Sequence, residues 1–254
     1  FNYVIVSVDI DGKSVLLDAT NKYATFDILP LNVINWKGRL IRTDVTSEEI
    51  NLVPKTPSKE MVDMIVTIDP NSIIKAKVRV QKVDYEAFEF RENYAGVNRE
   101  SYLEKLEEIS NGIQVKEYQI DNEEDLSKPI VETYSFESDN HLDRIGGKIY
   151  INPLLFFTQY KNPFVQEKRY FPIYFAYPQI KKFNVNIEIP EGYVIESIPE
   201  AVTLNMIDNV GKFSYKIAAV ANKVQVSITS EMNLASVPTE YYDTLKDYYQ
   251  KMID

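Results

Sequence analysis

Alternating apolar and polar residues predict β-strands over most of the chain. Near the start, residues 3–8 and 14–17 are rich in Val, Ile and Leu and flank Asp11-Gly12, a dipeptide typical of tight hairpin turns. We therefore predict a β-hairpin there. Further strand-like runs, separated by polar or Gly- and Pro-containing turns, cover residues 38–41, 61–68, 73–81, 113–120 and 130–137.

Helical spacing replaces this alternation in the middle of the chain. Residues 85–91 change to a helix-like period. Residues 102–109 then place apolar side chains on one helical face, and Asn111-Gly112 predicts the end of that helix. Thr46 and Glu49 have the spacing of a capping box, which predicts one further short helical turn.

The C-terminal part combines several short strands with a final helix. Val185, Ile187 and Ile189 alternate with polar residues, which indicates one buried and one solvent-exposed face. Repeated short strands of this kind predict an antiparallel β-sandwich. The terminal helix begins after Pro238, and its apolar residues fall at positions 241, 245, 248 and 252, on one face. The predicted strands cover residues 149–151, 183–189, 202–206, 213–218 and 224–229.

These elements predict a mainly β (α+β) protein in three parts. Residues 1–57 carry the first hairpin and end in a Pro-containing linker, residues 53–58. Residues 58–145 form a mixed β/α segment, and residues 146–254 form the β-sandwich with its C-terminal helix.

Composition narrows the possible functions of the chain. It has 254 residues, 44% of them hydrophobic and 26% charged, which is typical of a globular protein. Its net charge is −10, and the sequence contains no basic stripe. Nucleic acid and anionic membrane surfaces are therefore unfavourable partners. With no cysteine, the chain contains no thiol nucleophile and no Cys-ligated metal.

Targeting signals are also missing from the sequence. No apolar run reaches the roughly 20 residues of a membrane span, and no signal peptide precedes the first strand. The chain starts at Phe1, without an initiator Met, inside a predicted strand. We therefore expect it to be truncated, with any targeting signal upstream.

The first hairpin resembles the end of the core in transglutaminase-like cysteine enzymes, which have a papain-type fold and a Cys-His-Asp triad. Their motif reads H-A-W-V-E-V-x-x-D-G-x-W-x-x-x-D-P-T, and here Asp11-Gly12 matches its turn and Asp18-Ala19-Thr20 its end. In such a triad the histidine takes the thiol proton and the aspartate orients the imidazole. Tyr3, fifteen positions before Asp18, occupies the place of the family's histidine.

Later segments extend the resemblance to large bacterial cell-envelope proteins of this type, in which a β-rich domain of unknown function follows the core. The resemblance implies a periplasmic or cell-surface location, and it implies the upstream core of the same protein as a partner. A protein or glycan is a further possible partner. The similar segments are residues 17–23, 38–41, 88–91, 148–153, 170–178 and 189–193.

The resemblance implies that Tyr3 and Asp18 are vestigial triad positions, so we predict no catalytic residue, metal ligand or cofactor site in this chain. Tyrosine, with an ordinary pKa of about 10, is a poor general base at neutral pH. Asp18 is interpreted as a structural residue that hydrogen-bonds main chain at a strand end. Its alternative role is the orienting carboxylate of a triad whose other members lie upstream.

Other candidate residues have a structural interpretation beside a functional one. His141, the only histidine, together with Asp139 and Asp143 could ligate a metal, although an exposed turn fits these residues better. The acidic residues 121–125 resemble a calcium loop in composition but lack its ligand spacing. Trp36, with Tyr23 and Phe26, is interpreted as core or interdomain packing, with a sugar-stacking platform as the alternative.

The leading hypothesis is a non-catalytic accessory module, structural or interaction-bearing, in a bacterial transglutaminase-like cell-envelope protein. The alternative hypothesis is that the chain is part of a thiol-dependent protease or transglutaminase-like enzyme. Its catalytic Cys would then lie upstream, and Asp18 would complete the triad. A glycan-binding sandwich is a third hypothesis, and it requires an exposed row of aromatic side chains on one face.

Overall fold

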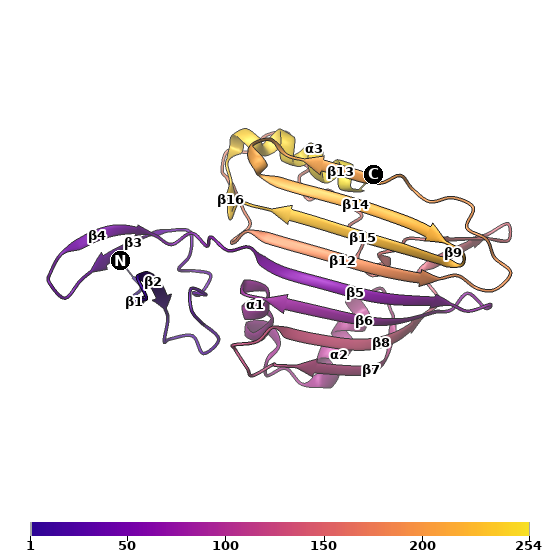
Figure 1. The fold of residues 1–254 in the computed structure, drawn as a ribbon, viewed down its shortest axis with the longest axis horizontal. Coiled ribbons are helices and arrows are strands. Elements are labelled where there is room, and N and C mark those ends of the chain that lie inside the picture. The colour runs from indigo at the N-terminus through magenta and orange to yellow at the C-terminus, as the bar shows by residue number, and fades with distance from the viewer. Residues whose placement is uncertain (1, 254) are drawn as a thin grey trace.

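An eight-stranded sheet dominates the structure, a computed structural model that describes residues 2–253 (Figure 1). β12 and β5 pair in parallel, and every other neighbouring pair in this sheet is antiparallel. Across the sheet, the strands are β13 (Val202–Asn205), β14 (Gly211–Val220), β15 (Lys223–Met232), β12 (Gln179–Glu188), β5 (Ser58–Ile68), β6 (Ile74–Val83), β8 (Ile130–Ser138) and β7 (Gln114–Asp121).

The parallel pair joins two segments that the sequence placed in separate domains. Val185 of β12 lies opposite Met64 of β5, and Ile187 lies opposite Val66, so their apolar residues continue on one face. The mainly β class and the terminal helix are confirmed. The predicted β-sandwich is wrong. The strands after residue 146 do not form two stacked sheets, because they extend the sheet of the middle segment.

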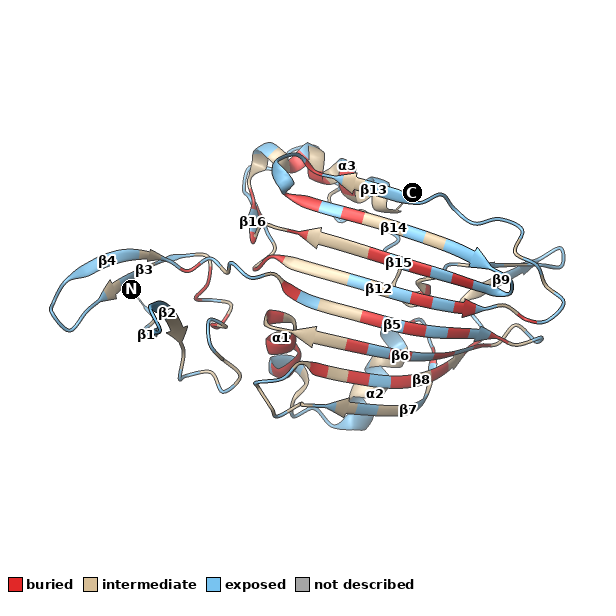
Figure 2. Ribbon diagram, in the orientation of Figure 1, coloured by how far each residue is buried: buried red, intermediate tan, exposed pale blue. Residues whose placement is uncertain are grey.

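One face of the sheet is buried and the other is open to solvent, as Figure 2 shows by the alternating colours along the strands. In β5, Val62, Met64 and Val66 are at most 1% exposed, whereas Ile65 between them is 60% exposed. Period-two alternation therefore produces a single core on one side of the sheet.

Helices and a small hairpin cover the buried face. Leu106, Ile149, Leu155 and Leu245 contact the core side chains of the sheet from four of these covering elements. None of the helices in the described residues combines the length and apolar composition of a membrane-spanning segment. The covering elements are α1 (Tyr85–Tyr94), α2 (Arg99–Ile109), β9 (Leu142–Ile145), β10 (Lys148–Ile151), η1 (Leu155–Phe157) and α3 (Tyr242–Ile253).

Helix α2 has the two ends that its sequence favours. The side chain of Asn98 accepts a hydrogen bond from the main-chain N–H of Glu100 at 2.8 Å, which caps the N-terminus. At the other end, Gly112 has φ +75° and donates its N–H to the carbonyl of Glu107 at 2.8 Å. The predicted stop at Asn111-Gly112 is therefore confirmed.

Short elements connect and close the main ones. β11 and β16 pair beside the end of the sheet, and η3 leads directly into α3. Their bounds are β11 (Ile173–Tyr174), β16 (Ser236–Val237), η2 (Ile207–Asn209) and η3 (Thr239–Tyr241).

The N-terminal segment projects beyond one end of the large sheet (Figure 1). It contains the predicted hairpin, β1 (Val6–Ile10) with β2 (Lys13–Leu17), and a second hairpin, β3 (Lys37–Ile41) with β4 (Ser47–Asn51). Asp11 and Gly12 have φ of +50° and +77°, the left-handed values that a type I′ turn requires.

The predicted helical turn after Thr46 is wrong, because residues 47–51 pair with β3. Asp44 accepts hydrogen bonds from the N–H and hydroxyl of Thr46 at 3.0 and 2.6 Å, which forms the hairpin turn. Glu49, the would-be capping partner, instead reaches Lys37 across the hairpin at 2.5 Å.

A second hydrophobic cluster attaches the N-terminal segment to the remainder of the protein. Leu29, Ile34 and Leu52 pack there against Phe88 of α1 and Tyr177. The main-chain N–H of Leu29 also donates to the hydroxyl of Tyr85 at 3.1 Å. The first hairpin, which lies in this segment, therefore has its supporting surface on α1.

A charged network lies on the covered face of the sheet, near α1 and α2. Glu60 of β5 contacts Lys82 of β6 at 2.9 Å and Lys181 of β12 at 3.3 Å. Lys82 also lies 3.6 Å from Glu132, whose side chain is 5% exposed. Glu132 accepts hydrogen bonds from the hydroxyls of Tyr102 and Tyr118. These charges are mutually paired, which is the condition for burying them.

Acid is expected to weaken the fold through Glu60. Burial raises the pKa of Glu60, but its ion pairs with Lys82 and Lys181 lower that pKa further, to below the usual range. Such a group stabilises the folded state above its unfolded pKa of about 4.3, and this contribution is lost as pH falls through the folded pKa. Urea unfolding between about pH 7 and 3 should show declining stability below about pH 4.

Glu60→Gln should remove part of this acid-induced decline. Glu86→Gln serves as the control, because burial raises the pKa of Glu86 and gives its titration the opposite effect on stability. A decline of equal size in the wild type and in Glu60→Gln would exclude Glu60 as its source.

Candidate functional site

Tyr3 and Asp18, the two positions that the resemblance assigns to a vestigial triad, lie in one hydrogen-bonded cluster at the open end of the first hairpin. The hydroxyl of Tyr3 lies 2.6 Å from Oγ1 of Thr20, which donates to Oδ1 of Asp18 at 2.8 Å. The same Oδ1 accepts the main-chain N–H groups of Thr20 and Asn21 at 2.7 and 2.9 Å. The register of β1 and β2, if continued, places Tyr3 opposite Thr20.

The cluster stabilises a neutral tyrosine beside an ionised aspartate. Burial raises the pKa of Asp18, but the hydroxyls of Tyr3 and Thr20 and the main-chain donors lower it to below its usual value. The hydrogen bond with Thr20 lowers the pKa of Tyr3, but burial and the Asp18 carboxylate raise it to above its usual value. At neutral pH, Tyr3 therefore donates hydrogen bonds and takes up no proton.

Asp18 also keeps one oxygen free. Its Oδ2 is buried and has no hydrogen-bond partner among residues 2–253. The main-chain contacts match the structural role that the sequence suggests for Asp18, and the free oxygen is the atom that an orienting role would use.

His141 lies in the wall of a cavity, away from this cluster. Its Nδ1 is 2.6 Å from Oγ of Ser138, and its ring packs edge-on against Phe156 at 5.8 Å between centroids. Burial lowers its pKa, so the ring is neutral at pH 7. In the part of the chain that the structure describes, no three His, Asp or Glu side chains gather closely enough to hold a metal ion.

The acidic loop 121–125 is organised by an arginine. Arg91 of α1 is 3% exposed, and its guanidinium donates to main-chain carbonyls of this loop and of Lys128. Asp125 accepts hydrogen bonds from the N–H and hydroxyl of Ser127 at 3.1 and 2.6 Å. The carbonyls that a calcium ion would use thus bind a protein cation instead.

The three N-terminal aromatic residues have different surroundings. Tyr23 packs against the second hydrophobic cluster, as expected. Trp36 and Phe26 are 68% and 72% exposed, so the packing interpretation is wrong for these two. The preceding residue, Asn35, anchors this loop instead by donating to the carbonyl of Ala176 at 2.6 Å.

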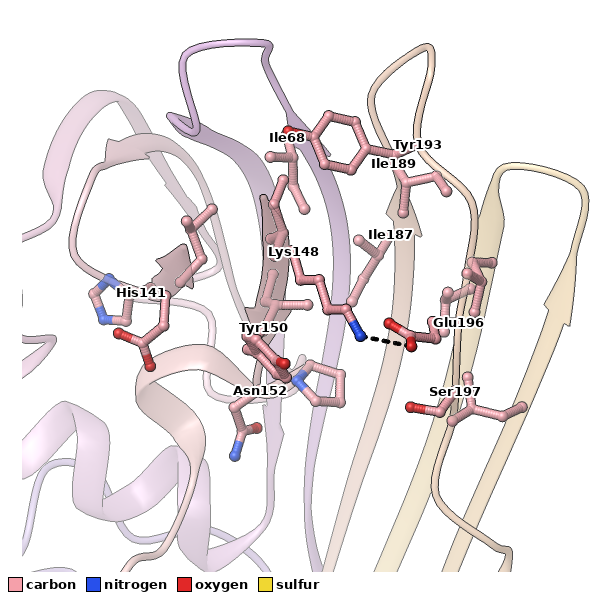
Figure 3. A pocket seen from close by; sticks show the side chains of 18 of the residues that line it. Ile68, His141, Lys148, Tyr150, Asn152, Ile187, Ile189, Tyr193, Glu196 and Ser197 are labelled. Atoms are coloured by element: carbon pink, nitrogen blue, oxygen red, sulfur yellow. Dashed lines mark hydrogen bonds and ion pairs between the residues drawn. The ribbon is translucent and has the colours of Figure 1, made fainter. Parts of the chain in front are cut away.

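A cavity of about 1040 Å³ opens elsewhere on the protein, and the sequence did not predict it. It lies between hairpin β9–β10 and residues 193–199, which we call the strap (Figure 3). Its floor is made of apolar residues near one end of the large sheet: Ile68, Ile187, Ile189, Ile217 and Val224.

Two contacts between side chains cross the cavity and hold the strap to the hairpin. Lys148 of β10 reaches Glu196 at 2.7 Å, which Figure 3 marks as a dashed line. Arg144 of β9 donates to the hydroxyl of Tyr193 at 3.1 Å. Both ion-pair side chains are more than half exposed, so this bridge is weak. Residues 193–199 show no period-two alternation, so the sequence predicted no element in the strap.

Comparison with known proteins finds a similarity over part of the chain. Residues 147–254 match the model of a family described as a domain of unknown function, DUF3858. A crystal structure at 2.00 Å of a candidate protease from Parabacteroides distasonis is similar, with 14% sequence identity and a TM-score of 0.44. The similarity covers 98% of the present chain and 33% of that one, so the present chain spans about a third of its length. No curated protein matches the chain.

Proposed function

We propose that the chain is the C-terminal portion of a bacterial transglutaminase-like cell-envelope protein and acts there as a non-catalytic accessory module, periplasmic or at the cell surface. The match of residues 147–254 to a domain of unknown function supports the trailing-domain part of this proposal. The motif around Asp11-Gly12, folded as the expected hairpin, supports the part that concerns the upstream core. The module's role is structural or interaction-bearing.

The observation that carries the proposal is the position of Tyr3 in the hairpin. Its hydroxyl is connected to Asp18 through Oγ1 of Thr20, and the two residues occupy the positions that the family's motif gives to histidine and aspartate. A general base must accept a proton near the working pH. The raised pKa of Tyr3 keeps it protonated, so it is unsuited to activating a thiol.

Asp18 favours a second candidate function, an enzyme whose catalytic Cys lies upstream. Its lowered pKa keeps the carboxylate ionised, and its buried Oδ2 has no hydrogen-bond partner among residues 2–253. In this alternative an upstream histidine replaces Tyr3 as the base, and Asp18 orients it.

Full-length protein should show neither amine incorporation into casein nor casein hydrolysis above background. The physical reason is that a thiol without an adjacent base is largely protonated at neutral pH. Tyr3→His is the informative variant, because it restores an imidazole beside Asp18. Activity is followed as fluorescent-amine incorporation and as release of labelled casein fragments.

Asp18→Asn separates the two functions. It keeps the side-chain shape but removes the charge that would orient an imidazole. Wild-type activity that falls by about 10⁴-fold in Asp18→Asn, as for a triad aspartate, would establish the enzyme alternative and refute the accessory role. Activity of the Tyr3→His variant alone would support the vestigial assignment of Tyr3.

A further inference from the structure

The layer that covers the large sheet is incomplete above the cavity. Ile149 and Ile151 of β10 point toward the core, and Ile195 of the strap does the same on the other side of the gap. Lys148 arches across the gap toward Glu196 (Figure 3). Between β10 and the strap, the apolar floor is therefore covered by no main chain of residues 2–253.

β10 has a free hydrogen-bonding edge. Gly146 and Gly147, with φ of +58° and +80°, form a two-residue turn whose closing hydrogen bond joins Ile145 and Lys148. Bonded and non-bonded pairs alternate in an antiparallel ladder, so the main-chain groups of Ile149 and Ile151 point away from β9. No other main-chain group among the described residues pairs with them.

The strap also has unpaired main chain. Residues 194–201 adopt no regular structure and make no main-chain to main-chain hydrogen bond within residues 2–253. A second hollow, of about 590 Å³, lies on its other side, against Ala219 and Ala221. The strap is therefore loosely packed on both sides. Besides Ile195, which packs on the core, it is held by the contacts of Glu196 with Lys148 and of Tyr193 with Arg144.

Two unpaired main chains across an apolar floor favour one class of ligand. Neighbouring strands lie about 4.8 Å apart and need main-chain N–H and C=O groups as partners. A lipid or a small apolar molecule could cover the floor, but it would leave both edges unpaired. An extended peptide supplies main-chain groups along its edges and side chains to the floor.

We propose that the cavity binds an extended peptide segment of a partner protein, which adds to β10 as a strand between β10 and the strap. Apolar side chains at alternate positions of the peptide contact Ile68, Ile187 and Ile189, and the intervening side chains face Lys148 and Glu196. Entry requires that this exposed ion pair and the hydrogen bond from Arg144 to the hydroxyl of Tyr193 open. The inference goes beyond the proposed accessory role and does not depend on the N-terminal hairpin.

Selection of short random peptides displayed on phage against the whole chain tests the proposal. We expect enrichment of sequences with apolar residues at every second position. The best selected peptide, synthesised with a fluorescent label, is then titrated against three proteins: wild type, Ile149→Pro and Ile149→Val.

Ile149→Pro removes the free-edge N–H without removing a hairpin hydrogen bond, and it should weaken binding by about tenfold or more. Ile149→Val keeps the N–H and should bind within about twofold. If the proline variant does not fold, the same peptide N-methylated at alternate residues takes its place against the wild type, with the same expected loss. No enrichment of alternating sequences, or equal binding by the proline variant or the methylated peptide, would overturn the proposal.

Discussion

Lys82→Met should lower the free energy of unfolding by about 3 kcal/mol, because it leaves buried carboxylates without their shared cation. Lys82 contacts both Glu60 and Glu132, and these three side chains are 16%, 18% and 5% exposed. After the substitution, Glu60 retains Lys181, but Glu132 retains only tyrosine hydroxyls. In thermal unfolding, the melting temperature should fall by roughly 6–12 °C.

Lys75→Met is the matched control on the same strand. Lys75 lies on the open face of the sheet, 3.6 Å from Glu137, with both side chains well exposed. Lys75→Met should change the free energy of unfolding by no more than about 0.5 kcal/mol. If Lys82→Met were as mild as Lys75→Met, the network would contribute little to the fold.

Phe88→Ala should cost about 3–5 kcal/mol and release the N-terminal segment. Phe88 is 1% exposed and packs against Tyr85 at 6.2 Å between ring centroids. Its cluster includes Leu29, Ile34 and Leu52 of that segment, so a cavity there weakens the contact of the segment with α1. Limited proteolysis with mass spectrometry should then show early cleavage within residues 2–57.

Phe26→Ala is the control for proteolysis, because Phe26 is 72% exposed and its truncation creates no cavity. In the wild type and in this control, the N-terminal segment should resist protease as long as the sheet does. Equal resistance of the segment in Phe88→Ala would mean that other contacts hold it, such as the hydrogen bond from Asn35 to Ala176.

The sequence predicts most strands and all three α-helices, because period-two and helical spacing are local properties. The hairpin at Asp11-Gly12 and the helix end at Gly112 depend on left-handed backbone conformations that those residues favour. The wrong prediction of a helical turn after Thr46 has a local cause as well. Its capping-box spacing competes with Asp44, whose side chain forms a turn and leads residues 47–51 into a strand.

The arrangement of the sheet could not be predicted in this way. The pairing of β12 with β5 joins residues more than 100 positions apart, for example Val185 with Met64, and no turn specifies it. Strands in a sandwich and strands in one extended sheet have the same alternation. The number of sheets therefore depends on long-range pairing rather than on any single strand.

The two candidate sites also differ in whether they depend on local sequence or on long-range contacts. The juxtaposition of Tyr3 and Asp18 follows from a hairpin of known turn, so their spacing was sufficient to predict it. The cavity depends on how hairpin β9–β10 and the strap lie over the sheet, which the local pattern of neither segment reveals. Lys148 and Glu196, which bridge it, lie 48 positions apart.

The rate of iodoacetamide alkylation of the full-length protein, measured between about pH 5 and 9, tests the vestigial assignment of Tyr3 most directly. A thiol paired with an imidazole is a thiolate far below its ordinary pKa of about 8.5, and it reacts rapidly even in mild acid. We predict no thiol that reacts rapidly near pH 6. A rapid reaction at that pH, slowed in Asp18→Asn, would contradict the account and assign Asp18 to a working triad.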